Sequence, residues 1–262
     1  MQTLYDENQL VATLEENGLC RVYLNNPNEL NALTTQMAKG ARELSVIIKK
    51  TNARVVVFSG KGRAFSAGGD LNYLLSLTKL TKEESSAAML DFYNSYLTLF
   101  TLPLPTISYI NGPCVGAGFS LALHSDMRFI VSGTKVGMNF TRIGLNPGMA
   151  SELHAHGDNS LLIREMLLTG RIYSSSEPRL RPLFNLVAST EEINAALNLT
   201  INDILHASPQ SIRLTLPYLR KSCTLEELLK AEATGQGICM STGEIREAVD
   251  AQKKGKKFYF TK

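Results

Sequence analysis

Apolar residues in the first part of the chain follow two different periods, which predict strands and a helix in turn. Residues 10–14 and 20–24 are rich in apolar and β-branched side chains and flank Glu16-Asn17-Gly18, so they predict a β-hairpin. Residues 34–50 carry apolar side chains at helical spacing, namely Met37, Ala41, Leu44, Ile47 and Ile48. Residues 54–60 form a continuous apolar run, typical of a strand that is buried on both faces between helices.

The next elements alternate in the same way, as a helix near 84–101, a strand at 106–110, a buried helix at 119–123 and a strand at 127–131. Pro103 and Pro105 end the first of these helices, because proline lacks a donor and restricts the residue before it. This order predicts an α/β fold in which βα units follow one another in a right-handed spiral.

Beyond about residue 195 the pattern is helical only. Residues 225–233 and 244–254 are amphipathic, with Thr224 and Ser241 as N-caps. We therefore expect a spiral core over residues 1–195 and a helical C-terminal region over 196–262 that serves oligomerisation and closure of the pocket.

Composition narrows the class of protein. The chain has 262 residues, 19% of them charged, and a net charge of +3, which is too small to indicate nucleic-acid binding. Its four cysteines are scattered without metal-ligand spacing, and no apolar run is long enough to cross a membrane. The N-terminus is polar and acidic, unlike a signal or transit peptide. We expect a cytoplasmic enzyme with no metal and no membrane or nucleic-acid partner.

Two turns of small residues carry the chemistry. Each of them, Phe65–Asp70 and Asn111–Gly118, lies between an apolar strand and a helix. A pair of such turns can aim backbone N–H groups at one point, as in an oxyanion hole for a thioester carbonyl. The sequence lacks the dinucleotide glycine pattern and the Walker A motif, so dinucleotide binding and Walker-type phosphate binding are not indicated. It also lacks the G-x-S-x-G elbow, which argues against an ordinary α/β-hydrolase.

These segments together resemble the crotonase (enoyl-CoA hydratase/isomerase) superfamily. The matching segments follow the family order over roughly residues 10–190: Leu24–Pro27, Asn31–Leu33, Val57–Leu71, Leu104–Ile107, Asn111-Gly112, Leu121–Arg128, Gly144–Gly148 and Leu167–Arg171.

The resemblance implies a crotonase-like spiral of ββα turns and a helical C-terminal region for trimerisation, giving a homotrimer or a dimer of trimers. It also implies a coenzyme A thioester substrate, with no cofactor beyond the coenzyme A of the substrate. By position, Gly69 and Ala117 supply the two oxyanion N–H groups.

The acidic residues of similar hydratases are missing from this chain. Those enzymes use two glutamates, whose positions are occupied here by Ser120 and Phe140. A third position, used as an acid or nucleophile by some isomerases and a dehalogenase, is Gly148. The sequence therefore predicts that two-glutamate hydration is not the mechanism.

Three nearby side chains remain as candidate acids or bases. Asp70 directly follows Gly69 but also reads as a helix cap. Glu152 lies one helical turn beyond Gly148. Tyr73 falls where a tyrosine assists some decarboxylating relatives, although the lysine that accompanies it there is replaced by Leu71.

For the other polar side chains near these motifs, the sequence predicts a structural role rather than a catalytic or metal-binding one. Asp126 matches a family aspartate of structural character, and His124 lies close to it. His154 and His156, two residues apart on an expected helix, point in different directions, so they do not form a shared metal site.

The resemblance also suggests which residues contact the coenzyme A ester. The first turn and the residues after it are expected to bind the ligand, together with the second turn and the two empty glutamate positions: Ala67, Gly68, Gly69, Asp70, Leu71, Asn72, Ala117, Ser120 and Phe140. Lys253 or Lys254 is expected to reach a phosphate of coenzyme A, in its own subunit or across a subunit boundary.

The function expected from these observations is that of an acyl- or enoyl-CoA enzyme that stabilises a thioester enolate, by isomerisation or decarboxylation rather than hydration. Two alternatives stay open. The first is a catalytically silent protein that binds a CoA ester, and the second is a thioester hydrolase.

Overall fold

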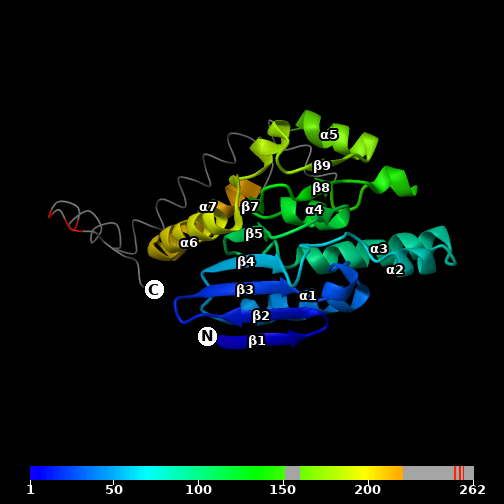
Figure 1. Ribbon diagram of the computed structural model, residues 1–262. Helices are drawn as coiled ribbons and strands as arrows, with labels where there is room; N and C mark the ends of the chain where they lie inside the picture. The colour runs from blue at the N-terminus through cyan, green and yellow to red at the C-terminus, as the bar shows by residue number, and fades with distance from the viewer. Residues whose placement is uncertain (151–159, 221–250, 252–253, 255, 257–262) are drawn as a thin grey trace.

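The computed structural model describes residues 1–150, 160–220, 251, 254 and 256 and is built on a seven-stranded sheet (Figure 1). In spatial order its strands are β1 (Gln2–Glu7), β2 (Leu10–Leu14), β3 (Leu19–Leu24), β4 (Val55–Gly60), β5 (Thr106–Ile110), β7 (Met127–Val131) and β10 (Leu186–Ala188). The β1–β2 and β2–β3 pairs are antiparallel, whereas β3, β4, β5, β7 and β10 run parallel. The predicted α/β class is confirmed.

A second sheet of three short strands lies beside the first. It contains β6 (Cys114–Val115), β8 (Lys135–Gly137) and β9 (Ile172–Ser174), in the order β6-β8-β9. The strand β6 follows β5 almost directly, so the chain passes from one sheet into the other at residues 111–113.

Helices cover both sheets. The α-helices are α1 (Thr35–Ile48), α2 (Leu71–Leu77), α3 (Lys82–Leu97), α4 (Ala117–Leu123), α5 (Ser160–Thr169), α6 (Thr190–His206) and α7 (Pro209–Arg220), and short 3-10 helices are η1 (Pro27–Glu29), η2 (Phe140–Ile143) and η4 (Pro178–Leu183). Several N-termini are fixed by their sequence. The Thr34 hydroxyl accepts from the Met37 N–H, and Thr81 and Ser189 each form a capping box with the glutamate three residues later.

The middle strand β4 shows why its sequence is apolar at every position. Val56 and Phe58 point into the larger core, while Val55 and Val57 point to the opposite face. There the apolar stripe of α6 covers them, through Ile193, Leu197, Ile201 and Leu205. Because both faces are buried, alternation of polar and apolar residues is absent, as predicted.

The structure adds elements that the hydrophobic pattern did not predict. The first strand, β1, extends the expected hairpin to three strands; of its six residues only Tyr5 is buried, so it carries no period-two signal. The short helix α2 begins where the first turn and the cap residue Asp70 predict a helix, although its Leu71 and Leu75 are exposed and give no apolar stripe. The helix α3 ends at Leu97, earlier than the expected 101.

The expected boundary at residue 195 falls inside α6, which packs on the sheet. The division into core and C-terminal region stays a prediction, and the expected helices at 225–233 and 244–254 lie outside the described residues apart from 251 and 254. Among the helices that the structure describes, none is both long and apolar enough to cross a membrane.

Candidate active site

The two small-residue turns lie in direct contact. Ser66 pairs with Cys114 in a parallel bridge, and the Val115 N–H donates to the Ser66 carbonyl at 3.0 Å. A Cβ built on Gly68 would lie 3.0 Å from the Val115 carbonyl oxygen and 3.5 Å from the Ala117 nitrogen. The first turn, after β4, and the second turn, before α4, are therefore held against each other by their backbones.

The close approach requires glycine on both sides. Gly68 has φ +98° and Gly116 has φ +54°, a backbone conformation that residues with a side chain rarely adopt. A Cβ on Gly118 would lie 2.6 Å from the Cβ of Ser66, so α4 also packs too closely on the first turn to admit a side chain there.

A substitution at Gly68 tests this packing. Gly68→Ala should lower the free energy of unfolding by about 1–3 kcal/mol, because alanine is strained at this φ and its Cβ presses on the Val115 carbonyl. Gly133→Ala is the matched control, since Gly133 has φ +81° but nothing within 4 Å of its Cβ position. Chemical denaturation of both variants separates backbone strain from close contact, and equal losses would contradict the contact.

Two backbone amides remain without an acceptor where the turns meet. The Gly68 N–H donates to the Ser66 hydroxyl and the Asp70 N–H to the Leu33 carbonyl, at 3.2 and 3.0 Å. Within the part of the chain that the structure describes, the amides of Gly69 and Ala117 have no hydrogen-bond partner. Ala117 is the first residue of α4, where a helix leaves its N–H groups unpaired.

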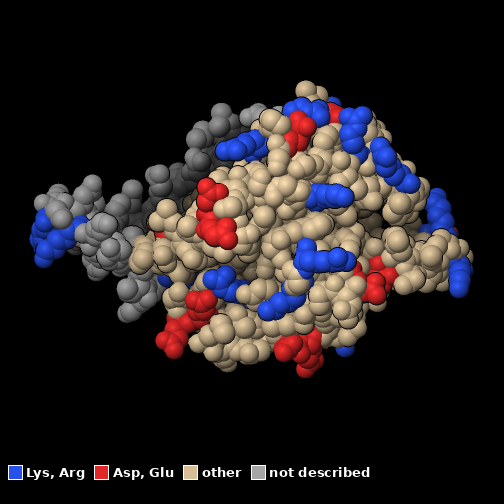
Figure 2. All heavy atoms as spheres, viewed as in Figure 1, with Lys and Arg blue, Asp and Glu red and all other residues tan. Residues whose placement is uncertain are grey.

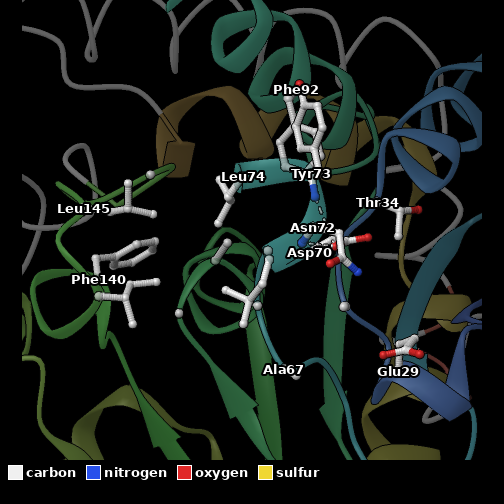
Figure 3. Close-up of a pocket in the computed structure, with 18 of the residues that line it drawn as sticks. Glu29, Thr34, Ala67, Asp70, Asn72, Tyr73, Leu74, Phe92, Phe140 and Leu145 are labelled. Atoms are coloured by element: carbon white, nitrogen blue, oxygen red, sulfur yellow. Dashed lines mark hydrogen bonds between the residues drawn. The ribbon is translucent and has the colours of Figure 1, made fainter. Parts of the chain in front are cut away.

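Both amides border a large cavity of about 1010 Å³. Its wall is mainly apolar and aromatic at the end formed by α2, α3 and η2, with Leu74, Leu77, Met89, Phe92, Phe140, Ile143 and Leu145. Figure 3 shows Phe140 and Leu145 on one side and Leu74 facing them, while Tyr73 stacks against Phe92. In Figure 2 the surface is hollowed at the right of the molecule, with Lys and Arg side chains around the hollow.

Most of the residues expected to contact the ligand line this cavity. They are Ala67, Gly68, Gly69, Asp70, Leu71, Asn72, Ala117 and Phe140, and Tyr73 lines it as well. Ser120 is different, because it is fully buried and its hydroxyl donates to the Gly116 carbonyl at 3.3 Å. Its small side chain turns back on α4 and does not reach the cavity wall.

Asp70 acts as a helix cap. One carboxylate oxygen accepts from the N–H groups of Asn72 and Tyr73, at 2.7 and 3.2 Å, at the start of α2 (Figure 3). Tyr73 has its ring stacked on Phe92 with centroids 5.4 Å apart. Burial, with the charge of Asp91 adding to it, raises the pKa of Tyr73, so its hydroxyl stays protonated at neutral pH.

His124 and Asp126 make contacts that stabilise the fold and do not point to a catalytic role. The imidazole of His124 lies 2.8 Å from the Met149 carbonyl oxygen. Asp126 accepts from Thr106 and from the guanidinium of Arg220. Glu152, His154, His156 and Lys253 lie outside the described residues, and Lys254 is exposed. Among described residues, no group of three His, Cys, Asp or Glu side chains forms a metal site.

The sequence did not single out three further residues of the cavity. Tyr93 lies on α3 against Gly148, Asn139 has its side-chain oxygen beside Gly116, and Arg63 is the one cation among the described residues that line the cavity. Helical spacing could have placed Tyr93 beside Met89 on one face of its helix, but no sequence signal says that this face borders a cavity.

Comparisons with known proteins agree on one family. A family model described as enoyl-CoA hydratase/isomerase matches residues 14–262. A candidate enoyl-CoA hydratase of Thermus thermophilus is 28% identical, over 91% of this chain and 95% of that protein. One from Mycobacterium tuberculosis is 30% identical, over 93% of this chain and 89% of that protein.

Solved structures share the fold. An enoyl-CoA hydratase of Bacillus anthracis superposes with a TM-score of 0.86 at 22% identity, covering 97% of this chain and 99% of that chain. A candidate enoyl-CoA hydratase of Thermobifida fusca, in complex with acetoacetyl-CoA, superposes with a TM-score of 0.75 at 23% identity, covering 90% of this chain and 96% of that chain.

Proposed function

The chain belongs to the enoyl-CoA hydratase/isomerase (crotonase) family, and we propose that it binds an acyl- or enoyl-CoA thioester and stabilises the enolate of that thioester. The observation that carries this proposal is the pair of unpaired amides, Gly69 and Ala117, on touching turns that open into one cavity. Backbone donors aimed at a developing oxyanion are worth about 3–4 kcal/mol each in mutational studies of other enzymes.

The cavity supports a coenzyme A ester as ligand. It is large, its inner end is apolar, and Arg63 supplies a positive charge that suits the phosphates of coenzyme A. The T. fusca relative of the same fold was solved with acetoacetyl-CoA. We propose no cofactor beyond the coenzyme A of the substrate, and cytoplasmic location.

A homotrimer or a dimer of trimers is part of the same proposal. The helix α5 leaves Leu161 and Leu168 77% and 79% exposed. Large apolar side chains exposed on one helix suit contact with a second copy of the chain.

The side chains around the amides favour decarboxylation or isomerisation over hydration. Of the two glutamate positions of the hydratases, one is the buried Ser120 and the other is Phe140, which no pH can make an acid. Glu29 and Asp70 are the carboxylates among the described cavity residues, and Asp70 is engaged in capping. Loss of CO₂ from a β-carboxylate leaves an electron pair on the α-carbon and forms the enolate without a base.

The silent CoA-ester binder remains the second candidate, favoured by the apolar wall of the acyl end. The thioester hydrolase is the third candidate function. It ranks last because hydrolysis requires a nucleophile or an activated water near the thioester carbonyl.

Turnover assays with crotonyl-, 3-enoyl- and malonyl-type CoA thioesters distinguish these functions. We expect turnover of the malonyl-type or 3-enoyl ester to exceed hydration of the crotonyl ester. Glu152 is a candidate base, and isomerisation needs a base, so Glu152→Gln should lower turnover of the 3-enoyl ester. Decarboxylation needs no base, so turnover of the malonyl-type ester should stay unchanged in the same variant. Saturable binding without turnover would support the binder, release of free coenzyme A the hydrolase, and no binding of any thioester would refute the proposal.

A further inference from the structure

Tyr93, in the second half of α3, presents a hydroxyl group at Gly148. A Cβ built on Gly148 would lie 2.6 Å from the Tyr93 hydroxyl oxygen and 2.9 Å from the ring carbon that bears it. The phenol therefore fills the space that a side chain at position 148 would take. Both residues line the cavity, so the hydroxyl is positioned at its wall by direct contact with the opposite segment.

The ring that bears this hydroxyl lies among apolar side chains. The ring of Phe92 meets the Tyr93 ring edge-on, with centroids 6.3 Å apart, and Met89 of the same helix lines the same wall. No residue in the described parts of the chain accepts or donates a hydrogen bond at the Tyr93 hydroxyl. Burial, and to a smaller extent the neighbouring Tyr73, raise the pKa of Tyr93, which is therefore a neutral hydrogen-bond donor at pH 7.

An unpaired hydroxyl at the wall of a binding cavity makes the cavity selective. Solvent satisfies it while the cavity is open, but a hydrocarbon chain that displaces this solvent leaves the hydroxyl without a partner. A ligand oxygen at the same place restores the bond. Sites built in this way discriminate strongly against analogues that lack the polar group.

We propose that Tyr93 determines substrate specificity by donating a hydrogen bond to an oxygen carried on the acyl chain, beyond the thioester carbonyl. The substrates would then be acyl-CoA esters with a keto, hydroxyl or carboxylate oxygen rather than plain hydrocarbon acyl chains. This inference rests on the proposed function, namely that the cavity binds an acyl-CoA ester. Tyr93 is chosen over Tyr73 because its hydroxyl is fixed against Gly148.

Calorimetric titration with acetoacetyl-CoA and butyryl-CoA tests the inference, since the two acyl chains have the same number of carbons and differ in one oxygen. The wild-type protein should bind acetoacetyl-CoA about tenfold more tightly. Tyr93→Phe should abolish this preference by weakening acetoacetyl-CoA binding alone. Tyr109→Phe, on β5 and outside the described wall of the cavity, is the matched control and should keep the preference.

The outcomes are distinct. Equal affinity of the wild-type protein for the two esters, or an unchanged preference in a folded Tyr93→Phe variant, overturns the inference and leaves the proposed function standing. Failure of the wild-type protein to bind either ester overturns the inference, and the proposed function is refuted as well if the crotonyl-, 3-enoyl- and malonyl-type esters also fail to bind. The wild-type comparison decides the question even if Tyr93→Phe does not fold.

Discussion

Ala117→Pro should lower kcat by about 10²–10³-fold while the protein keeps its fold. Proline has no N–H, so the substitution removes one of the two proposed oxyanion donors and alters no other polar group. A donor that acts on the developing charge of the transition state affects kcat rather than KM. The measurement is steady-state kinetics with whichever thioester the wild-type protein turns over.

The fold should tolerate this change because of where Ala117 lies. It is the first residue of α4, and its N–H makes no hydrogen bond within the described structure. Proline is favoured at the first position of a helix, since its fixed φ suits the helix there. The preceding Gly116 has ψ −130°, outside the helical region that proline forbids to the residue before it.

Ala117→Gly is the control for the proline variant. It keeps the N–H and alters only the side chain, so kcat should stay within a few-fold of wild type. Circular dichroism melting curves of both variants show whether the fold is retained. A folded Ala117→Pro protein with wild-type kcat would exclude the Ala117 amide from the oxyanion hole.

The sequence predicts the backbone parts of this site better than its side chains. The turns were predictable because close approach at Gly68 and Gly116 demands glycine, and glycine is visible in the sequence. The two-sided burial of β4 was predictable for a similar reason, since its apolar run excludes an exposed face.

The direction in which side chains point was harder to predict from the sequence. The resemblance predicted Ser120 as a ligand contact at one of the glutamate positions, but its hydroxyl donates to the carbonyl of Gly116, the N-cap of its own helix. Tyr93 was missed because its role depends on contact with Gly148, more than fifty residues away. Local periodicity gives the buried face of a helix, but it does not say whether that face meets core or cavity.

The largest expected loss of stability belongs to Asp126. Its carboxylate accepts from the Thr106 N–H at 2.7 Å and from the Nε of Arg220 at 2.8 Å. Arg220 also donates to the carbonyls of Leu102 and Leu104, at 2.6 and 2.8 Å. The pair is mostly buried, with side-chain exposures of 13% for Asp126 and 21% for Arg220.

Asp126→Ala should lower the free energy of unfolding by about 3 kcal/mol, because it leaves a mostly buried guanidinium without its counter-charge. Desolvation acts on Arg128 as well: burial lowers its pKa and Asp126 opposes that shift, so a second cation loses compensation. The fully buried Thr106 also loses the acceptor of its N–H. Chemical denaturation measures the change.

The exposed pair of Arg42 and Asp91 provides the control. Its side chains are 47% and 66% exposed, so Asp91→Ala should change the free energy of unfolding by less than about 1 kcal/mol. A loss in Asp126→Ala no larger than that in Asp91→Ala would contradict the role assigned to the buried pair. The double variant Asp126→Leu/Arg220→Met should recover part of the loss, since it removes both charges together.

The Asp126 and Ala117 variants should lose different properties: Asp126→Ala should lose stability and Ala117→Pro should lose kcat. Comparing them therefore separates support of the fold from catalysis. Thr106 begins β5, and the chain leaves β5 for the second turn and Ala117, so Asp126 supports the site only through the fold. Well below its melting temperature, Asp126→Ala should therefore keep kcat near wild type, whereas Ala117→Pro loses kcat at every temperature. A large fall in kcat for folded Asp126→Ala would show instead that the start of β5 controls the position of the second turn.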